Sequence, residues 1–196
     1  MKPEDAERVE VETREAWGRW LEAHHDTATG AWLVSWRKHT GKPAVGYEPS
    51  VEEALRFGWV DSKGRKLDDD RTMLWFAPRK RRSGWSRPNK ERIARLEVAG
   101  RMAPAGRAAV EAAKADGSWT LLDDVEDLVV PPDLAAAFAE HPGGAEQFEA
   151  FPRSAKRGIL EWIVQAKTAA TREKRIAETA RLAAQGERAN QWRPKS

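Results

Sequence analysis

Tryptophan is unevenly distributed along this chain, and its distribution constrains the fold more than any other feature. Eight of the ten tryptophans lie between Trp17 and Trp119. Each large aromatic ring needs a substantial core around it, so the first part must build an aromatic core that the second part does not need. We therefore expect a Trp-rich domain over residues 1–122, an acidic, Pro-containing connector over 123–133, and a second domain over 134–190.

The first domain combines helical and strand patterns. Trp17, Trp20 and Leu21 recur at helical spacing after Thr13, which can cap the helix. Residues 50–53 read as a capping box that starts a short helix at Ser50. Further patterns predict strands at 30–38, 59–61 and 72–76, a helix that Ser86 or Asn89 caps, and a helix from Pro104 to about Gly117.

The second domain has helical patterns only. Pro132 starts a short helix that Gly143 and Gly144 end, and Ser154 caps a longer one. The last helix begins at Thr168 or Thr171. The predicted class is therefore α+β and mainly helical, with a small antiparallel sheet in the N-terminal part and a C-terminal helical bundle.

Composition excludes several classes of protein. The chain has no cysteine, which excludes disulfides, cysteine-bound metals and a thiol nucleophile. Its mean hydropathy is -0.73 and its start does not resemble a signal peptide, so we expect no membrane span and a cytoplasmic location. It contains no Walker motif, no dinucleotide-binding fingerprint and no Gly-x-Ser-x-Gly motif. The sequence therefore indicates no cofactor and no metal, and it fixes no reaction.

The strongest candidate site is the basic segment 78–90, which encloses a tryptophan and precedes a predicted helix. A helix N-terminus with nearby cations favours an anion such as phosphate or carboxylate. In this hypothesis Arg79, Ser83 and Ser86 hold the anionic group, Trp85 forms an aromatic wall, and Asn89 fixes the loop by capping. The alternative is a solvated basic loop in which Ser86 or Asn89 only caps the helix.

A second group of residues follows Gly58. Trp59 and Asp61 stand two apart on a predicted strand, so both side chains point to one face. Trp59 would complete the aromatic wall and Asp61 would orient a cation or a donor, with Lys38 and His25 at the rim. The alternative is a core tryptophan and an aspartate in a structural salt bridge.

Several separated motifs give the chain a resemblance to a known family. They are residues 20–25, 30–34 with Lys38, 53–61, 78–79, 83–86 with Asn89, 100–102, 132–134 through 167, and 171–176. With these motifs the chain resembles the YdeI/OmpD-associated, or bacteriocin-protection, family of bacteria from about residue 13 to 186. One position departs from the family pattern, because Arg56 stands where the family usually has cysteine.

The resemblance implies a role in protection against bacteriocins and cationic antimicrobial peptides, and no particular enzymatic step. Our leading prediction is a stress-tolerance protein that binds a small anionic ligand or a peptide in the Arg/Trp/Ser pocket. A nucleic-acid-binding module is the second hypothesis, because basic residues and tryptophans can grip phosphates and stack on bases. An enzyme acting on a small anionic metabolite is the third. The sequence does not indicate an oligomeric state.

Overall fold

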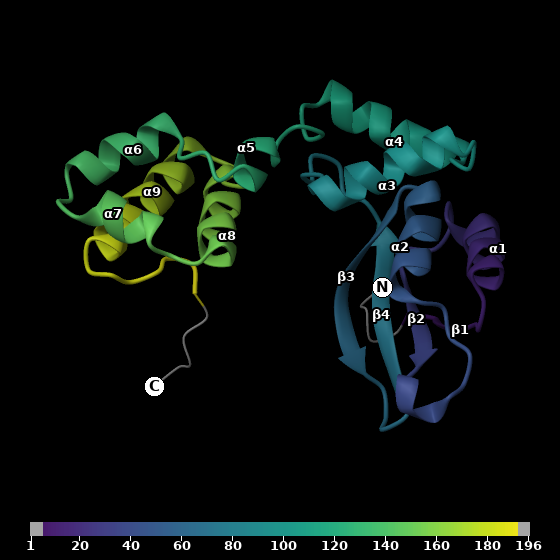
Figure 1. The fold of residues 1–196 in the computed structure, drawn as a ribbon. Coiled ribbons are helices and arrows are strands. Elements are labelled where there is room, and N and C mark those ends of the chain that lie inside the picture. Colours follow the sequence, from purple (N-terminus) through teal and green to yellow (C-terminus); the bar gives the residue numbers. More distant parts are fainter. Residues whose placement is uncertain (1–5, 192–196) are drawn as a thin grey trace. The chain divides into compact units, whose positions relative to one another are not determined.

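A computed structural model describes residues 6–191 of the chain. The chain forms two compact units, Met1–Trp119 and Thr120–Ser196 (Figure 1). Strands occur in the first unit, and helices occur in both, which confirms the α+β class.

The sheet of the first unit has the strand order β1-β2-β4-β3. Its strands are β1 (Arg8–Glu10), β2 (Ala31–Trp36), β3 (Trp59–Lys66) and β4 (Arg71–Pro78). The pairs β2–β4 and β4–β3 are antiparallel, as predicted. The sheet as a whole is mixed, because β1 pairs with β2 in parallel. With only three residues, β1 is too short for a period-two pattern to reveal it.

Helices α1 (Arg14–His24) and α2 (Tyr47–Arg56) lie against one side of this sheet, and α3 (Arg87–Val98) and α4 (Pro104–Ala115) lie beyond one end of it (Figure 1). A short helix, η2 (Lys38–Thr40), follows β2. Thr13 caps α1 as predicted, since its hydroxyl accepts a hydrogen bond from the backbone N–H of Ala16.

The predicted start of α2 was wrong. The helix begins three residues earlier, at Tyr47, and its N-cap is Gly46. Ser50 therefore lies inside the helix, where its hydroxyl donates to the carbonyl oxygen of Tyr47 at 2.7 Å. The glutamate assigned to the capping box, Glu53, is free to make tertiary contacts instead.

The main core of the first unit is aromatic, as the tryptophan distribution predicts. Trp17, Trp59 and Trp85 are at most 2% exposed and pack with Phe76 of β4 and Leu33 of β2. This core fills the space between the sheet and the helices and holds the start of β3 and the end of β4 firmly in place.

The second unit consists of α5 (Asp123–Glu126), α6 (Pro132–Ala139), α7 (Gly144–Glu149), α8 (Arg153–Val164) and α9 (Ala169–Ala183). Thr168 caps α9, as one of the two predicted alternatives. The predicted cap of α8 was wrong: Ser154 lies inside the helix, and Pro152 is the N-cap. The expected connector begins with helix α5, whose Val125 is buried in the core of this unit.

Candidate functional site

Residues 79–86 form the loop between β4 and α3, which we call the basic loop. Its first residue is anchored to the start of β3, because the backbone N–H of Arg79 donates to the carbonyl oxygen of Gly58 at 3.0 Å. In its middle, both the N–H and the hydroxyl of Ser83 donate to the carbonyl oxygen of Lys80. Arg82 has a positive φ of 61°, which a residue with a side chain rarely adopts. The basic loop is therefore a specific structure with many backbone contacts.

Arg79 is the central side chain of this loop. Its guanidinium lies 3.8 Å from the centre of the Trp85 ring, and its Nη2 donates to the carbonyl oxygen of Gly84 at 2.8 Å. Its Nε atom is buried and has no hydrogen-bond partner among residues 6–191. Burial lowers the pKa of Arg79 to about 10, and the negative charge of Asp61 opposes this shift. Arg79 therefore keeps its charge at neutral pH although its hydrogen bonding is incomplete.

A pocket of about 60 Å³ lies between the basic loop and the C-terminal half of α4. Arg79, Ser83 and Trp85 line it from the loop side. The wall that α4 contributes is apolar and its side chains are short, because they are alanines. The other lining residues are Lys80, Arg81, Arg82, Ala109, Ala112, Ala113, Asp116 and Ser118.

The pocket has one carboxylate, Asp116, which is hydrogen-bonded both within its own turn and to the basic loop. Its Oδ1 accepts hydrogen bonds from both the backbone N–H and the hydroxyl of Ser118. These bonds, together with one from the backbone N–H of Arg82, lower the pKa of Asp116. In contrast, Lys80, Arg81 and Arg82 form no ion pair within 4.0 Å among the described residues, and all three are exposed. The mouth of the pocket is therefore strongly positive.

Only part of the predicted site lines this pocket. Trp59 does not line it: the ring is 1% exposed, and its Nε1 donates to the backbone carbonyl of His25 at 3.1 Å. Asp61 lies on β3 and accepts a hydrogen bond from the hydroxyl of Tyr47. His25 packs its ring against Phe57. Of these residues, Trp59 lies next to the anchoring point of the loop, because it follows Gly58 and pairs with Pro78 at the end of β4.

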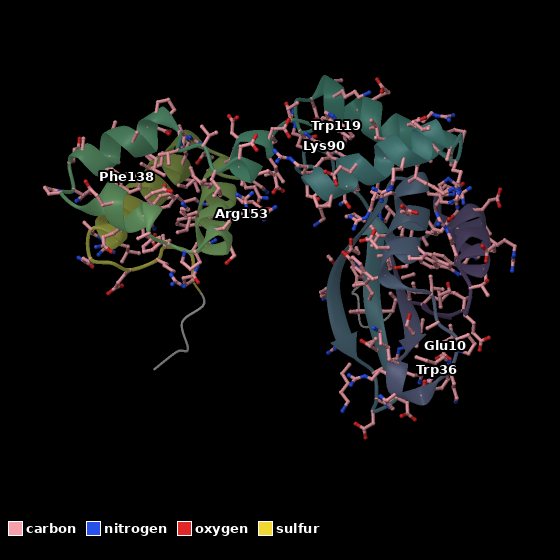
Figure 2. All side chains as sticks on the ribbon, in the orientation of Figure 1. Glu10, Trp36, Lys90, Trp119, Phe138 and Arg153 are labelled. Carbon is pink, nitrogen blue, oxygen red and sulfur yellow. The ribbon has the colours of Figure 1, made fainter. Side chains whose placement is uncertain are left out.

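The remaining predicted residues lie elsewhere. Ser86 is the N-cap of α3, but its side chain makes no capping hydrogen bond. Asn89 lies inside α3, so the prediction that it caps the loop was wrong; its Oδ1 accepts a hydrogen bond from Arg92. Lys38 follows β2 at the end of the sheet marked by Trp36, whereas Lys90 and Trp119 mark the opposite end, beside the basic loop (Figure 2).

Sequence reasoning missed the wall of the pocket that α4 provides. The sequence contains a signal for this wall, because Ala109, Ala112 and Ala113 recur at the spacing of one helix face. Such a stripe of small residues allows another segment to approach the helix closely. Sequence reasoning also missed Trp119, whose ring packs 5.0 Å from that of Trp85.

Two protein-family models match the chain. A model described as a domain of unknown function (DUF8412) matches residues 9–109, which is half of the sequence. The chain belongs to the DUF8412 family. A second model, described as "Bacteriocin-protection, YdeI or OmpD-Associated", matches residues 127–186. No curated protein and no solved structure gave a significant match.

The predicted YdeI/OmpD-associated resemblance is thus confirmed, over residues 127–186. The quoted motifs that precede residue 109 fall in the part that the DUF8412 model matches. The basic loop lies wholly within that DUF8412 match.

Two further observations on the described residues concern metal-binding groups and membrane-spanning helices. No group of three or more His, Cys, Asp or Glu within residues 6–191 is arranged to hold a metal ion. In the same range, every helix is too short or too polar to cross a membrane.

Proposed function

We propose that the N-terminal unit is a stress-tolerance receptor that binds a small molecule or peptide through one anionic group, a carboxylate or a phosphate, beside Arg79. The observation that carries this proposal is the state of the Arg79 guanidinium. It is largely desolvated, lacks an ion-pair partner among the described residues, and leaves Nε without an acceptor. A buried charge of this kind lowers stability unless a counter-charge is supplied.

The size of the pocket limits what can enter it. A volume of about 60 Å³ exceeds the roughly 10–15 Å³ that a single water molecule needs, so the pocket accommodates a few atoms. A single carboxylate or phosphate group fits this space. The rest of the ligand would lie outside, over Lys80, Arg81 and Arg82, which favour further negative charge.

The charge of the loop also bears on bacteriocin protection, the role named in the description of the C-terminal match. Four consecutive cations, at residues 79–82, repel a cationic antimicrobial peptide. Direct capture of such a peptide at this loop is therefore disfavoured. In our proposal, tolerance depends on an anionic molecule that the loop recognises.

The tryptophans of the site are poorly placed for nucleic-acid binding. Trp85 is 2% exposed and covered by Arg79 on one side, so it offers no free face for a base. Nucleic acid nevertheless carries phosphates that could reach the loop cations. For this reason oligonucleotides belong among the probes of the following test.

The test is a thermal-shift and calorimetry screen with acetate, inorganic phosphate, a phosphosugar, an acidic peptide and short oligonucleotides. We expect at least one small anion or the acidic peptide to stabilise the wild type. The Arg79→Gln variant should lose the part of this stabilisation that depends on the basic loop, while Arg107→Gln, which removes an exposed cation paired with Glu97, should keep it. Stabilisation that is undiminished in Arg79→Gln for every ligand, or binding of oligonucleotides alone, would contradict the proposal.

A further inference from the structure

We propose that a second pocket of the N-terminal unit, built around the buried carboxylate of Glu53, binds a compact anion of the phosphate or carboxylate class. It shares no lining residue with the pocket beside Arg79. The inference therefore stands independently of the function proposed above. The pocket lies among α1, the C-terminal end of α2 and the turn after α3, and its volume is about 210 Å³.

Glu53 forms the floor of this pocket. Its side chain is 1% exposed, and three arginines converge on it from different parts of the chain. Arg14 donates from Nε to Oε1 at 2.5 Å, Arg101 also donates to Oε1, and Arg56 donates to Oε2. One carboxylate therefore faces three guanidinium groups.

The positive charge at the floor exceeds the negative charge. Glu52, the only other carboxylate bonded to these three arginines among residues 6–191, accepts from Arg14 and is shared with Arg95. The four arginines and two glutamates of this network carry a net charge of +2. The Nε of Arg56 also donates a hydrogen bond to the backbone carbonyl oxygen of Arg101, and this bond fixes the orientation of the Arg56 guanidinium. The floor therefore presents rigid, cationic hydrogen-bond donors, which bind carboxylate and phosphate well.

Two glycines let these charged groups come together. A Cβ atom on Gly18 of α1 would lie 3.0 Å from Oε2 of Glu53 and 3.6 Å from Nη1 of Arg56. A Cβ atom on Gly106 of α4 would collide with the backbone carbonyl of Arg56. Because neither side chain is present, α1 and α4 approach the charged cluster closely, and the cluster is a built part of the fold.

The rim of the pocket carries both signs of charge. Arg19 lies between Glu15 and Glu22 on the exposed face of α1, and all three line the opening. The two glutamates repel any negative charge that extends out of the pocket. This arrangement favours an anion small enough to be held at the floor over a long polyanion such as a nucleic acid.

The test uses inorganic phosphate, titrated calorimetrically into the full chain at low salt. We expect saturable binding that Arg19→Gln and Arg101→Gln each weaken at least fivefold. Arg19 has no ion pair among the described residues, so its removal leaves the Glu53 network intact. The Arg107→Gln variant is the matched control, because Arg107 is an exposed arginine of α4 outside this pocket. Glu15→Gln should tighten binding about twofold, an effect that a structural defect would not produce.

The Arg79→Gln variant separates the two sites. If phosphate binding survives Arg79→Gln but falls in Arg19→Gln and Arg101→Gln, the Glu53 pocket is a site; losses in both sets of variants mean that both pockets take phosphate. If binding falls in Arg79→Gln alone, phosphate uses only the basic loop and this inference is wrong. No phosphate binding by the wild type, or losses no larger than in Arg107→Gln, would also overturn it.

Discussion

The two units of this protein use charge in different ways. In the C-terminal unit, several cations pair with carboxylates: Arg157 with Glu161, Arg172 with Asp133, and the buried Lys156 with Glu149. In the N-terminal unit, Arg79 is desolvated without an ion pair, and Glu53 is surrounded by three arginines.

This difference is the reason that we assign the proposed binding to the N-terminal unit. A surface ion pair stabilises a fold only slightly, and its matched charges leave no excess charge for a ligand to neutralise. Clustered cations that outnumber their carboxylates lower stability unless another anion joins them. Such an excess of cations is expected where residues are retained for function as well as for folding. We therefore place both candidate sites in the N-terminal unit.

The comparison of the two units predicts that a substitution at Glu53 changes the unfolding free energy most. Glu53→Gln keeps the shape but removes the charge that three arginines share, so the variant should lose about 3–5 kcal/mol of unfolding free energy. Urea denaturation measures this loss. Added phosphate should restore part of it, since an anion that binds only the folded state stabilises that state. A loss below about 1 kcal/mol would show that the cluster is no different from a surface pair.

Gly18→Ala should have the next largest effect. The added methyl group would lie 3.0 Å from the buried Glu53 carboxylate, so Glu53 or α1 must shift. We expect a loss of about 1–3 kcal/mol by urea denaturation, as for other overpacked sites. Gly41→Ala is unsuitable as a control because its φ of 64° strains any side chain, whereas Gly158, with nothing within 4 Å, is suitable. Equal effects of Gly18→Ala and Gly158→Ala would contradict the claim that α1 approaches the Glu53 carboxylate closely.

Arg79→Met should raise stability while it abolishes anion binding at the basic loop. The methionine removes a desolvated charge and can still pack on Trp85, so we expect a gain of about 1 kcal/mol in the unfolding free energy. Differential scanning calorimetry and the anion screen measure the two effects. A variant that is less stable than the wild type would show that Arg79 has a structural role.

The pH dependence of Arg79 gives a related prediction. Its pKa in the folded state is about 10, well below its ordinary value, so above about pH 10 the unfolded chain holds more protons than the folded chain. The contribution of Arg79 to stability should therefore rise with pH in that window. Anion affinity should fall there, because the guanidinium loses its charge. Affinity unchanged at pH 11 would contradict a contact with Arg79.

The smallest effect is expected in the C-terminal unit. The hydrogen bond from Arg172 lowers the pKa of Asp133, and both side chains are partly exposed. Asp133→Asn should lose less than about 1 kcal/mol. In the wild type this contribution is present above the ordinary pKa of Asp133, 3.8, and is lost as the pH falls below it. A loss comparable with that of Glu53→Gln would remove the contrast between the units.

The local pattern of the sequence predicted most elements, and the reasons for its failures are physical. Helix periodicity and the cap at Thr13 located α1, because both signals lie within a few residues. β1 was missed because its pairing with β2 depends on contacts distant in sequence. The sequence placed Ser50 at a helix start because it matches the capping-box pattern, whereas the fold extends the helix back to Tyr47.

The candidate site was predicted in part for the same reason. Arg79, Ser83 and Trp85 are close in sequence, and the structure places them on one pocket. Trp59 was assigned to the same wall, but its ring is buried in the core, and α4 supplies the opposite wall. The Glu53 cluster could not be predicted, because its arginines come from positions 14, 56 and 101 and only the tertiary fold brings them together.

The most direct test of the account is an NMR titration of the arginine side chains with the anion whose stabilising effect falls most in Arg79→Gln. The Nε–H signal of Arg79 is identified by its absence from the spectrum of Arg79→Lys. We predict that this signal shifts and saturates with the same Kd that calorimetry gives. An Arg79 signal that stays unchanged while calorimetry shows the protein saturated would contradict the claim that this guanidinium holds the ligand.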